Sequence, residues 1–447
     1  MGLVPRPRAL PIAPLAEPAR RRLPLAGPSR QKDGCRPIYA VWELTLRCDL
    51  ACRHCGSRAG RARPDELDTA QALDLVRQMA ELEVTEVILI GGEAYLRDDW
   101  LEIARAIVAH GMECNLTTGG RGMTPERARA AKAAGIRNVS VSLDGLEATH
   151  DALRGVTGAY KSALAALAAL KEAGIAITAN TQIGKQNLHE VPQVFEVLRA
   201  AGIHTWQVQL TVAMGRVADE PENLLLEPYQ VLEVLPMLAE LKRRGDAVGL
   251  RLFAGNNIGY FGPHEGTLRG SYPAGHMYSC GAGRTTLGIE ANGDIKGCPS
   301  LPTRDWVGGN VRDHSLKEIW EQSAPLRYTR DRSVEDLWGF CRTCYYADDC
   351  RAGCTWTAHT LFGRPGNNPY CHHRALTLLE EGLRERVVKR RDAGGQPFDF
   401  GEFELVLEPW PAGELDAART RLGRKPAEAP PTVRDGVEPR PEIRGTP

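Results

Sequence analysis

The chain has 447 residues, with 56 Lys or Arg against 56 Asp or Glu and a formal net charge of zero. This balance gives no bulk attraction to nucleic acid or to an anionic membrane, so we expect neither partner. No apolar run approaches the roughly 18–20 residues of a membrane-spanning helix, and the N-terminus lacks the apolar segment of a secretory signal. We therefore expect a cytoplasmic globular protein of about two domains.

Residues 1–37 are predicted to be a disordered basic arm, because residues 1–34 carry seven Pro and seven Arg or Lys without a periodic apolar pattern. Over 38–255, short β-rich runs alternate with amphipathic helical stretches. The expected strands are 38–45, 86–92, 113–118, 138–145, 175–182, 205–210 and 249–254. The expected helices are 68–82, 98–110, 125–134, 159–173, 189–201 and 228–244.

Repeated strand–helix units predict a parallel sheet in an α/β fold. No G-x-G-x-x-G fingerprint is present, so a full or partial (β/α) barrel is favoured over a dinucleotide-binding sheet. Polar chemistry then belongs at the C-terminal ends of the strands.

The alternation stops after residue 255. We expect a linker over 256–279, a small cysteine-rich domain over 280–395 and a mostly disordered tail over 396–447. In the second domain, "TTLGIEANGDIKGC" predicts a β-hairpin whose Asn292 and Gly293 suit a type I′ turn. Residues 374–391 predict a terminal helix.

The chain has 12 cysteines, and clustered cysteines in a reducing compartment indicate metal or redox chemistry rather than disulfides. In "LTLRCDLACRHCGSRAG", Cys48, Cys52 and Cys55 have C-x3-C-x2-C spacing. Three thiolates can ligate three irons of a [4Fe–4S] cluster and leave one iron open to a small molecule. A zinc site needs a fourth ligand, and His54 is awkwardly placed between two of the cysteines.

A second group contains more thiols than one closed cubane cluster takes. Its seven members are Cys280, Cys298, Cys341, Cys344, Cys350, Cys354 and Cys371. A zinc ribbon would use four of them and leave three without a role. More than one iron–sulfur site is therefore favoured here.

"CDLACRHC" after the first strand and "IGGE" (90–93) after the second resemble the radical S-adenosylmethionine (SAM) superfamily. The resemblance implies a partial (β/α)6 TIM-like barrel and a cluster whose open iron chelates the amino and carboxylate groups of SAM. The residue before the third cysteine is commonly aromatic in that family, whereas here it is His54.

The same resemblance implies SAM contacts from several strand ends. Glu93 would accept from the SAM ammonium, and Ser142 and Asp144 would contact its ribose or carboxylate. Further contacts are implied at Gly91, Gly92, Arg154 and Asn180. Each residue also has an ordinary structural interpretation, such as a turn serine, an N-cap aspartate or a surface arginine.

The seven-cysteine pattern resembles the SPASM domain, which implies two auxiliary [4Fe–4S] clusters and three clusters in all. One auxiliary cluster would be closed by Cys341, Cys344, Cys350 and Cys371. The other would be held by Cys280, Cys298 and Cys354, with an open iron, a non-cysteine ligand or a distant partner such as Cys35.

The implied activity is reductive cleavage of SAM to a 5′-deoxyadenosyl radical that abstracts hydrogen from a substrate. A ribosomally made peptide undergoing oxidative modification or cross-linking is the favoured substrate. The alternatives are tailoring of a tetrapyrrole or quinone precursor, sulfatase maturation and a non-catalytic iron–sulfur protein. Sulfatase-maturing relatives carry an acid just after the auxiliary cysteine, whereas Asp305 lies seven residues after Cys298.

The expected partners are a flavodoxin- or ferredoxin-type electron donor and a peptide or small protein substrate. A leader peptide would be bound by a separate recognition protein or by the basic arm. No residue is identified as a catalytic base.

Overall fold

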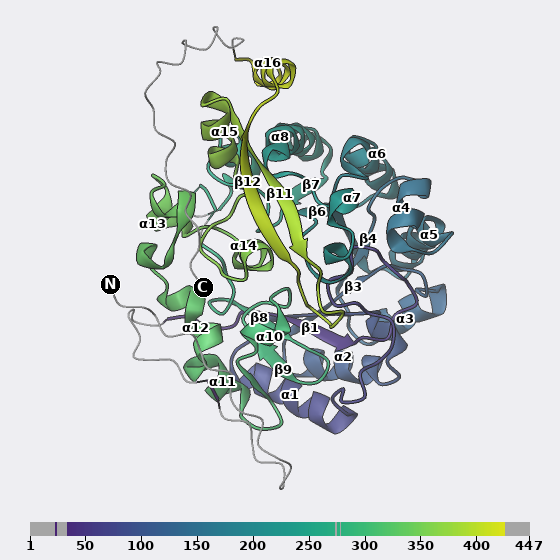
Figure 1. Ribbon diagram of the computed structural model, residues 1–447. Helices are drawn as coiled ribbons and strands as arrows, with labels where there is room; N and C mark the ends of the chain where they lie inside the picture. Colours follow the sequence, from purple (N-terminus) through teal and green to yellow (C-terminus); the bar gives the residue numbers. More distant parts are fainter. Residues whose placement is uncertain (1–22, 25–33, 273–274, 278, 425–447) are drawn as a thin grey trace.

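A ten-stranded sheet runs through the molecule in the order β10-β9-β8-β1-β2-β3-β4-β5-β6-β7 (Figure 1). The computed structural model describes residues 23–24, 34–272, 275–277 and 279–424. The strands are β1 Tyr39–Thr45, β2 Glu86–Gly91, β3 Glu113–Thr118, β4 Asn138–Ser142, β5 Ala176–Ile183, β6 Thr205–Leu210, β7 Arg251–Ala254, β8 Thr286–Ile289, β9 Asp294–Lys296 and β10 Gly309–Asn310.

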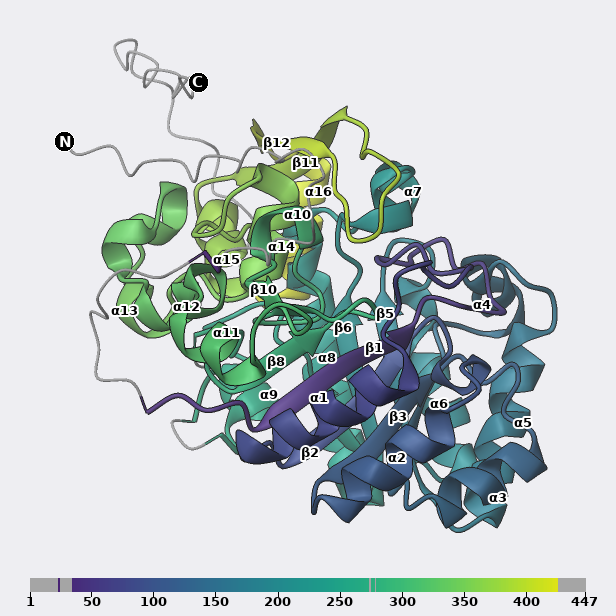
Figure 2. The same ribbon diagram turned by 90° about the horizontal axis from the view of Figure 1, so that it is seen from below.

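Strands β1 to β7 pair in parallel, and long helices on one side of the sheet form the outer layer of the barrel (Figure 2). These helices are α1 Thr69–Glu81, α2 Trp100–Ala109, α3 Pro125–Ala133, α4 Glu147–Arg154, α5 Ala159–Glu172, α6 Val191–Ala201 and α8 Val231–Val248. The predicted start of α3 is confirmed, because Thr124 caps the helix by accepting from the Arg127 N–H at 3.3 Å and Pro125 occupies the first turn.

Six strand–helix units followed by β7 confirm the predicted α/β fold with a partial (β/α)6 barrel. The sheet does not close, because β7 and β10 are its two edges. Alternate residues of each strand face the helices, and Trp42, Leu75 and Met79 belong to the resulting apolar core.

The second domain continues the sheet of the barrel. Strand β8 pairs in parallel with β1, with Thr286 opposite Tyr39, and β9 returns antiparallel to β8. The predicted hairpin is confirmed, but its type I′ turn is wrong. Of the two predicted turn residues, only Gly293 has a positive φ, of 85°. Its N–H donates to the Glu290 carbonyl at 2.9 Å. The longer loop lets Asn292 keep a negative φ, so one left-handed residue is enough.

Short helices follow the hairpin, and the remaining cysteines lie in these helices or next to their ends. The shorter α-helices of the chain are α7 Pro221–Leu224, α9 Glu265–Arg269, α10 Thr303–Trp306, α11 Leu316–Gln322, α12 Ala324–Asp331, α13 Ala347–Cys350 and α14 Thr355–Phe362. The 3-10 turns are η1 Ala94–Leu96, η2 Leu188–Glu190, η3 Gly215–Ala218, η4 Pro228–Gln230, η5 Val334–Asp336 and η6 Gly339–Arg342.

The C-terminal region differs from its prediction. The helix expected over 374–391 is α15 His372–Glu380 followed by strand β11 Leu383–Arg391. The expected tail from 396 contains strand β12 Glu402–Pro409, which pairs with β11, and helix α16 Ala412–Arg421. Two β-branched residues in β11 and the alternating apolar residues of "EFELVLEP" favour paired strands.

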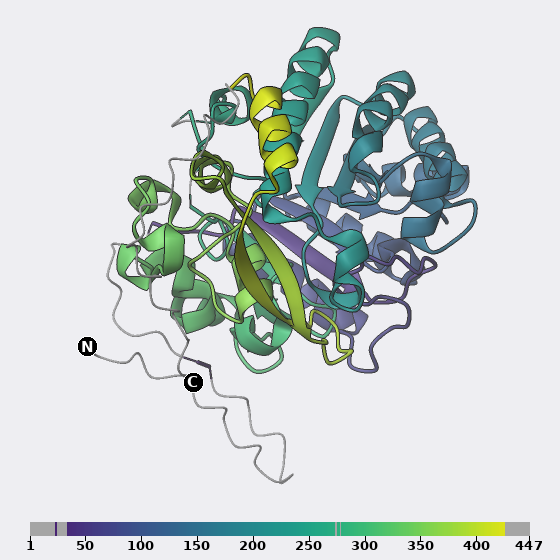
Figure 3. The ribbon, with the colours of Figure 1, turned by 45° about the horizontal axis from the view of Figure 1, so that its top comes forward.

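The β11–β12 hairpin is a long ribbon that lies across the barrel side of the second domain (Figure 3). Most of the predicted basic arm (1–22 and 25–33) and the end of the predicted tail (425–447) lie outside the described residues. Within the described part of the chain, no helix is both long enough and apolar enough to cross a bilayer.

Candidate cluster and cofactor site

Cys48, Cys52 and Cys55 lie together in the loop that follows β1. The three cysteines pack with Leu50 and Ala159 in one small cluster. Two backbone hydrogen bonds hold the loop against the end of α4: the Ala51 N–H donates to the Arg154 carbonyl at 3.1 Å, and the Arg53 N–H donates to the Leu153 carbonyl at 2.8 Å. The loop is therefore anchored at its centre while its thiols line a common cavity.

The chemistry of these thiols fits an iron–sulfur cluster. Burial raises the pKa of Cys48 to about 12 and that of Cys52 to about 11, so a bound cation is needed to hold them as thiolates at neutral pH. Within the described ranges, no three His, Cys, Asp or Glu side chains converge on a single metal ion. A cubane matches this arrangement, because each of its thiolates binds a different iron.

A cavity of about 220 Å³ opens beside the thiols, with Gly91 and Gly92 in its wall. Gly91 has a φ of 135°, which residues with a Cβ rarely adopt. A Cβ on Gly92 would lie 2.2 Å from the Arg47 carbonyl oxygen. Glycines at these positions therefore let the end of β2 pack against the backbone that leads into the cysteine loop.

Glu93 is buried at the base of the same cavity. Its Oε2 accepts from the Thr118 hydroxyl at 2.5 Å, and its Oε1 accepts from the Gly119 N–H at 2.7 Å. Burial nevertheless raises the pKa of Glu93 to about 7. A cationic ligand in the cavity would lower this pKa and gain a charge-assisted contact.

Five of the seven residues assigned to SAM line the cavity, and two do not. The five are Gly91, Gly92, Glu93, Ser142 and Arg154. Asp144 lies just behind the wall, where its Oδ2 is 2.5 Å from Arg154 Nη2. Asn180 is opposite Ser142 on the neighbouring strand, and its Oδ1 is buried without a hydrogen-bond partner in the described part of the chain.

His54 forms an unpredicted contact with Asp144. Its Nε2 lies 3.1 Å from Asp144 Oδ2, and the side chain is 4% exposed. Burial opposes ionisation of Asp144, but Arg154 and His54 outweigh it and hold the pKa of Asp144 far below its ordinary value. Arg154 also donates to Cys52 Sγ at 3.8 Å, so this ion pair braces one cysteine of the loop.

The seven cysteines of the second domain separate into two groups. Cys280 and Cys298 lie in one packed cluster with Trp306, and the charges of Cys280 and Cys354 both act on Cys298. The other group consists of Cys341, Cys344, Cys350 and Cys371. Burial raises the pKa values of Cys350 and Cys371, and the charges of other cysteines of this group add to the rise. In the first group, burial is the main cause of the rise in the pKa of Cys354 to about 11, and the charge of Cys280 adds to it. The SPASM resemblance predicts the same two sets as cluster ligands, and that assignment stays a prediction.

The loop between β11 and β12 covers the cysteine loop, which the sequence does not predict. The Phe398 N–H donates to the Gly56 carbonyl at 3.0 Å, and Asp399 Oδ1 lies 2.9 Å from Arg58 Nε. The Asp399 carbonyl accepts from the Gly215 N–H at 2.8 Å. The C-terminal hairpin therefore forms one wall of the barrel mouth, next to "CRHCGSR".

Residues 42–198 match the radical SAM superfamily, and residues 280–345 match an iron–sulfur cluster-binding domain, SPASM. The chain is 32% identical over 350 residues to the AdoMet-dependent heme synthase of Methanosarcina barkeri, covering 76% of this chain and 97% of that protein. The chain belongs to the radical SAM superfamily and carries a SPASM domain. The mycofactocin maturase MftC of Mycobacterium tuberculosis is 31% identical over 342 residues, covering 75% of this chain and 83% of that protein.

Solved radical SAM enzymes share the fold. Streptococcus suis SuiB bound to precursor peptide SuiA superposes with a TM-score of 0.57 at 17% identity, covering 75% of each chain. Native anSMEcpe with bound AdoMet superposes with a TM-score of 0.60 at 16% identity, covering 76% of this chain and 95% of that one. The protein is thus a radical SAM enzyme, and its two domains imply iron–sulfur clusters and SAM as cofactors.

Proposed function

We propose that this radical SAM enzyme oxidatively modifies a ribosomally made peptide. Cys48, Cys52 and Cys55 would hold the SAM-binding cluster. One auxiliary cluster would be held by Cys280, Cys298 and Cys354, and a third by the remaining set of Cys341, Cys344, Cys350 and Cys371. When bound, the reduced cluster and SAM supply a 5′-deoxyadenosyl radical that removes a hydrogen atom from the substrate.

The residues of the barrel bind and orient SAM in this proposal. Glu93 accepts from the ammonium group, and its own hydrogen bonds to Thr118 and Gly119 fix the carboxylate. Arg154, held by Asp144, presents a guanidinium in the wall of the same cavity. Gly91 and Gly92 bring the end of β2 into the wall of the cavity, while Ser142 at the end of β4, Asp144 just after it and Asn180 on β5 complete the proposed contacts.

One observation carries the oxidative part of the proposal. The hairpin that leads to Cys298 is continuous with the barrel sheet, because β8 pairs with β1. Strand β1 in turn leads directly to Cys48. Cys298 lies near Tyr39 at the start of β1, where its charge acts on the tyrosine hydroxyl, and Cys48 follows the end of the same strand. A site for accepting an electron and the site of hydrogen abstraction would therefore be joined by one short strand, which favours oxidation over simple isomerisation.

Two named relatives point to different substrates. One is called a mycofactocin maturase and the other a heme synthase. The charges near the barrel mouth favour an uncharged peptide segment over a tetrapyrrole that carries carboxylates. Three cations of this region, of which Lys296 is buried and the other two are partly buried, are already paired with carboxylates: Arg58 with Asp399, and Arg63 and Lys296 with Glu290.

The second candidate, tailoring of a tetrapyrrole, is supported by the heme synthase relative, which is matched over 97% of its length. Under either proposal we expect a cytoplasmic enzyme that receives electrons from a flavodoxin- or ferredoxin-type donor. For a peptide substrate, a separate protein or residues 1–34 would bind the leader. The test is a pull-down of the precursor peptide by the chain lacking residues 1–34. If this shortened chain binds the precursor with full affinity, residues 1–34 are not the leader-binding segment.

The test compares two substrates under anaerobic reducing conditions. The reconstituted enzyme is incubated with SAM and either a panel of synthetic peptides or a panel of carboxylated tetrapyrroles. Mass spectrometry then measures 5′-deoxyadenosine and the substrate. A peptide product lighter by hydrogen or by a small leaving group supports the proposal. Turnover of a tetrapyrrole with an unchanged peptide would contradict it and favour the second candidate.

A further inference from the structure

A buried carboxyl group lies on the inner face of β1. Glu43 is 2% exposed, and its neighbours Trp42 and Leu44 pack into the core under the helices. Glu43 is opposite Ile90 in the parallel pairing of β1 with β2, so both side chains lie on the same face of the sheet. Ile90 lines the cofactor cavity. Glu43 is therefore next to that cavity, on the side of the SPASM hairpin.

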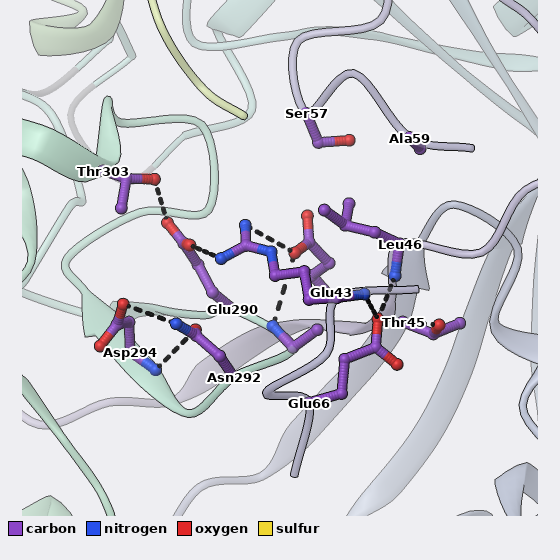
Figure 4. Close-up of polar contacts among 12 residues, drawn as sticks. Glu43, Thr45, Leu46, Ser57, Ala59, Glu66, Glu290, Asn292, Asp294 and Thr303 are labelled. Atoms are coloured by element: carbon purple, nitrogen blue, oxygen red, sulfur yellow. Dashed lines mark hydrogen bonds and ion pairs between the residues drawn. The ribbon is translucent and has the colours of Figure 1, made fainter. Parts of the chain in front are cut away.

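The two oxygens of Glu43 have different surroundings (Figure 4). Oε1 accepts from the Ala291 N–H and from Arg63 Nη2, both at 3.4 Å. The other oxygen points away from these donors, toward the side on which Ser57 and Ala59 lie, and receives no hydrogen bond from the residues that the structure describes. Ala59 also lines the cofactor cavity. The free oxygen of Glu43 is therefore turned toward the barrel mouth.

Glu290 takes the stronger contacts with the cations that face this site. Arg63 Nη1 is 2.9 Å from Glu290 Oε2, and Lys296 Nζ is 2.7 Å from Oε1. The Thr303 hydroxyl also donates to Oε1 at 2.5 Å. The charged groups facing Glu43 are thus Arg63 from the cysteine-loop side and Glu290 and Lys296 from the SPASM hairpin.

The surroundings shift the pKa values of Glu43 and Glu290 in opposite directions. Burial raises the pKa of Glu43 to about 8; Glu290 adds to the rise, and Arg63 and Lys296 oppose it. Burial also acts on Glu290, but Lys296 and Arg63 outweigh it and lower the pKa of that carboxyl group. Glu290 consequently stays ionised, and Glu43 exchanges a proton near neutral pH.

We propose that Glu43 is the catalytic proton acceptor for oxidation of the substrate. After a hydrogen atom has left a substrate carbon to form 5′-deoxyadenosine, the substrate radical loses a proton to the free oxygen of Glu43. The electron left on the substrate would go to an iron–sulfur cluster held by the SPASM cysteines, so that the substrate would lose two electrons in total. Arg63 and Glu290 are positioning residues. The assignment rests on the oxidative part of the proposed function and does not depend on whether the substrate is a peptide.

The test compares Glu43→Gln and Glu43→Asp with Glu86→Gln as a matched control. Glu86 starts β2 at the opposite end of the barrel and accepts from Asn115 at 2.8 Å. In the wild type, oxidised product should increase with pH through about 8, because the acceptor must be ionised. Glu43→Gln should lower product by about 10²–10⁴-fold and abolish this pH dependence. Glu43→Asp should restore part of the product yield and part of the pH dependence. Glu86→Gln should resemble the wild type in both respects.

Two readouts separate proton transfer from a structural role. A merely structural Glu43 would lower 5′-deoxyadenosine and product together, whereas a proton acceptor raises the ratio of 5′-deoxyadenosine to product. Infrared spectra of the cluster-free protein should contain a protonated carboxyl band that disappears through about pH 8 and is missing in Glu43→Gln. The proposal is overturned if Glu43→Gln keeps the wild-type product yield and pH profile, or if that band is unchanged.

Failure of the proposed function would look different. The wild type would then leave the peptides unchanged and oxidise a tetrapyrrole instead. The same ratio, measured with the tetrapyrrole, then tests Glu43. If the wild type oxidises neither substrate while it cleaves SAM, the infrared titration decides, because a Glu43 that remains ionised down to acidic pH overturns the assignment.

Discussion

Replacing Gly92 by alanine tests how the end of β2 supports the cysteine loop. A Cβ at this position would lie 2.2 Å from the Arg47 carbonyl oxygen and 2.8 Å from the Leu46 carbonyl oxygen. Ordinary contact begins at 3.4 Å, so the new Cβ and the Arg47 carbonyl oxygen must move apart by about 1.2 Å. Both obstacles are backbone atoms, which cannot rotate away as a flexible side chain would.

The displacement acts on the residue next to Cys48. The Arg47 carbonyl accepts from the Glu93 N–H at 2.8 Å, so Gly92→Ala should disturb both the cysteine loop and Glu93. Overpacking costs about 1–3 kcal/mol, and loss of this hydrogen bond adds about 1 kcal/mol. At about 1 °C per kcal/mol for a chain of this size, we expect the Tm to fall by about 2–4 °C. The affinity for SAM should fall at least about tenfold.

Gly60→Ala is the matched control for Gly92→Ala. Gly60 lies in the same loop region and has no positive φ, and a Cβ at this position would have open space around it, with no other part of the chain within 4 Å. The free energy of unfolding of Gly60→Ala should stay within about 0.5 kcal/mol of the wild-type value. Scanning calorimetry of the cluster-free proteins and SAM titration of the reconstituted ones provide the measurements. A Gly92→Ala variant that melts and binds SAM like Gly60→Ala would refute the close-approach argument.

Three further predictions concern the clusters, the cofactor and the C-terminal loop. Alanine at all three N-terminal loop cysteines should lower reconstituted iron from about twelve to about eight per chain; unchanged iron would contradict the cluster assignment. SAM affinity of the wild type should rise from pH 6 to pH 8 as Glu93, whose pKa is about 7, ionises, and Glu93→Gln should bind about 10–100-fold more weakly without that rise in calorimetric titrations. Arg58→Met removes the ion pairs with Asp219 and Asp399, so limited proteolysis within 392–401 should accelerate. The control is Arg390→Met, which breaks an exposed ion pair with Glu404. This variant should be cleaved at the wild-type rate.

The barrel was predictable because its signals are local. Each strand of the barrel has a periodic apolar run, and helix starts such as Thr124-Pro125 fix element boundaries within a few residues. The cysteine spacing indicates its chemistry in the same way, since Cys48, Cys52 and Cys55 must share one loop. The helix α4, by contrast, was missed, because "EATHDALR" is short and has few apolar residues. It carries Arg154 and His150.

The C-terminal hairpin was missed for a different reason. Residues 374–391 contain a helical apolar pattern at their start, and "LRERVVKRR" continues it with charges that suit an exposed helix. Strand β11 forms because β12 offers it a partner, with Val387 opposite Leu405. Pairing with a distant segment outweighs the local preference. Residues 383–391 by themselves contain no signal that identifies this strand, because its partner lies further along the chain.

Glu43 shows why a candidate base was absent from the sequence analysis. In "AVWELT" it is one acid in an otherwise apolar strand, which alternation places on the inner face. Nothing nearby in the sequence explains how the charge is tolerated. The answer lies in Arg63, 20 residues on, and in Glu290 and Lys296 at the hairpin, which the β1–β8 pairing brings to the same place. The hairpin thus extends the sheet and also adjusts the protonation of a barrel residue. If Glu43 accepts the substrate proton as proposed, the SPASM domain would take part in proton transfer, in addition to the cluster chemistry that its cysteines indicate.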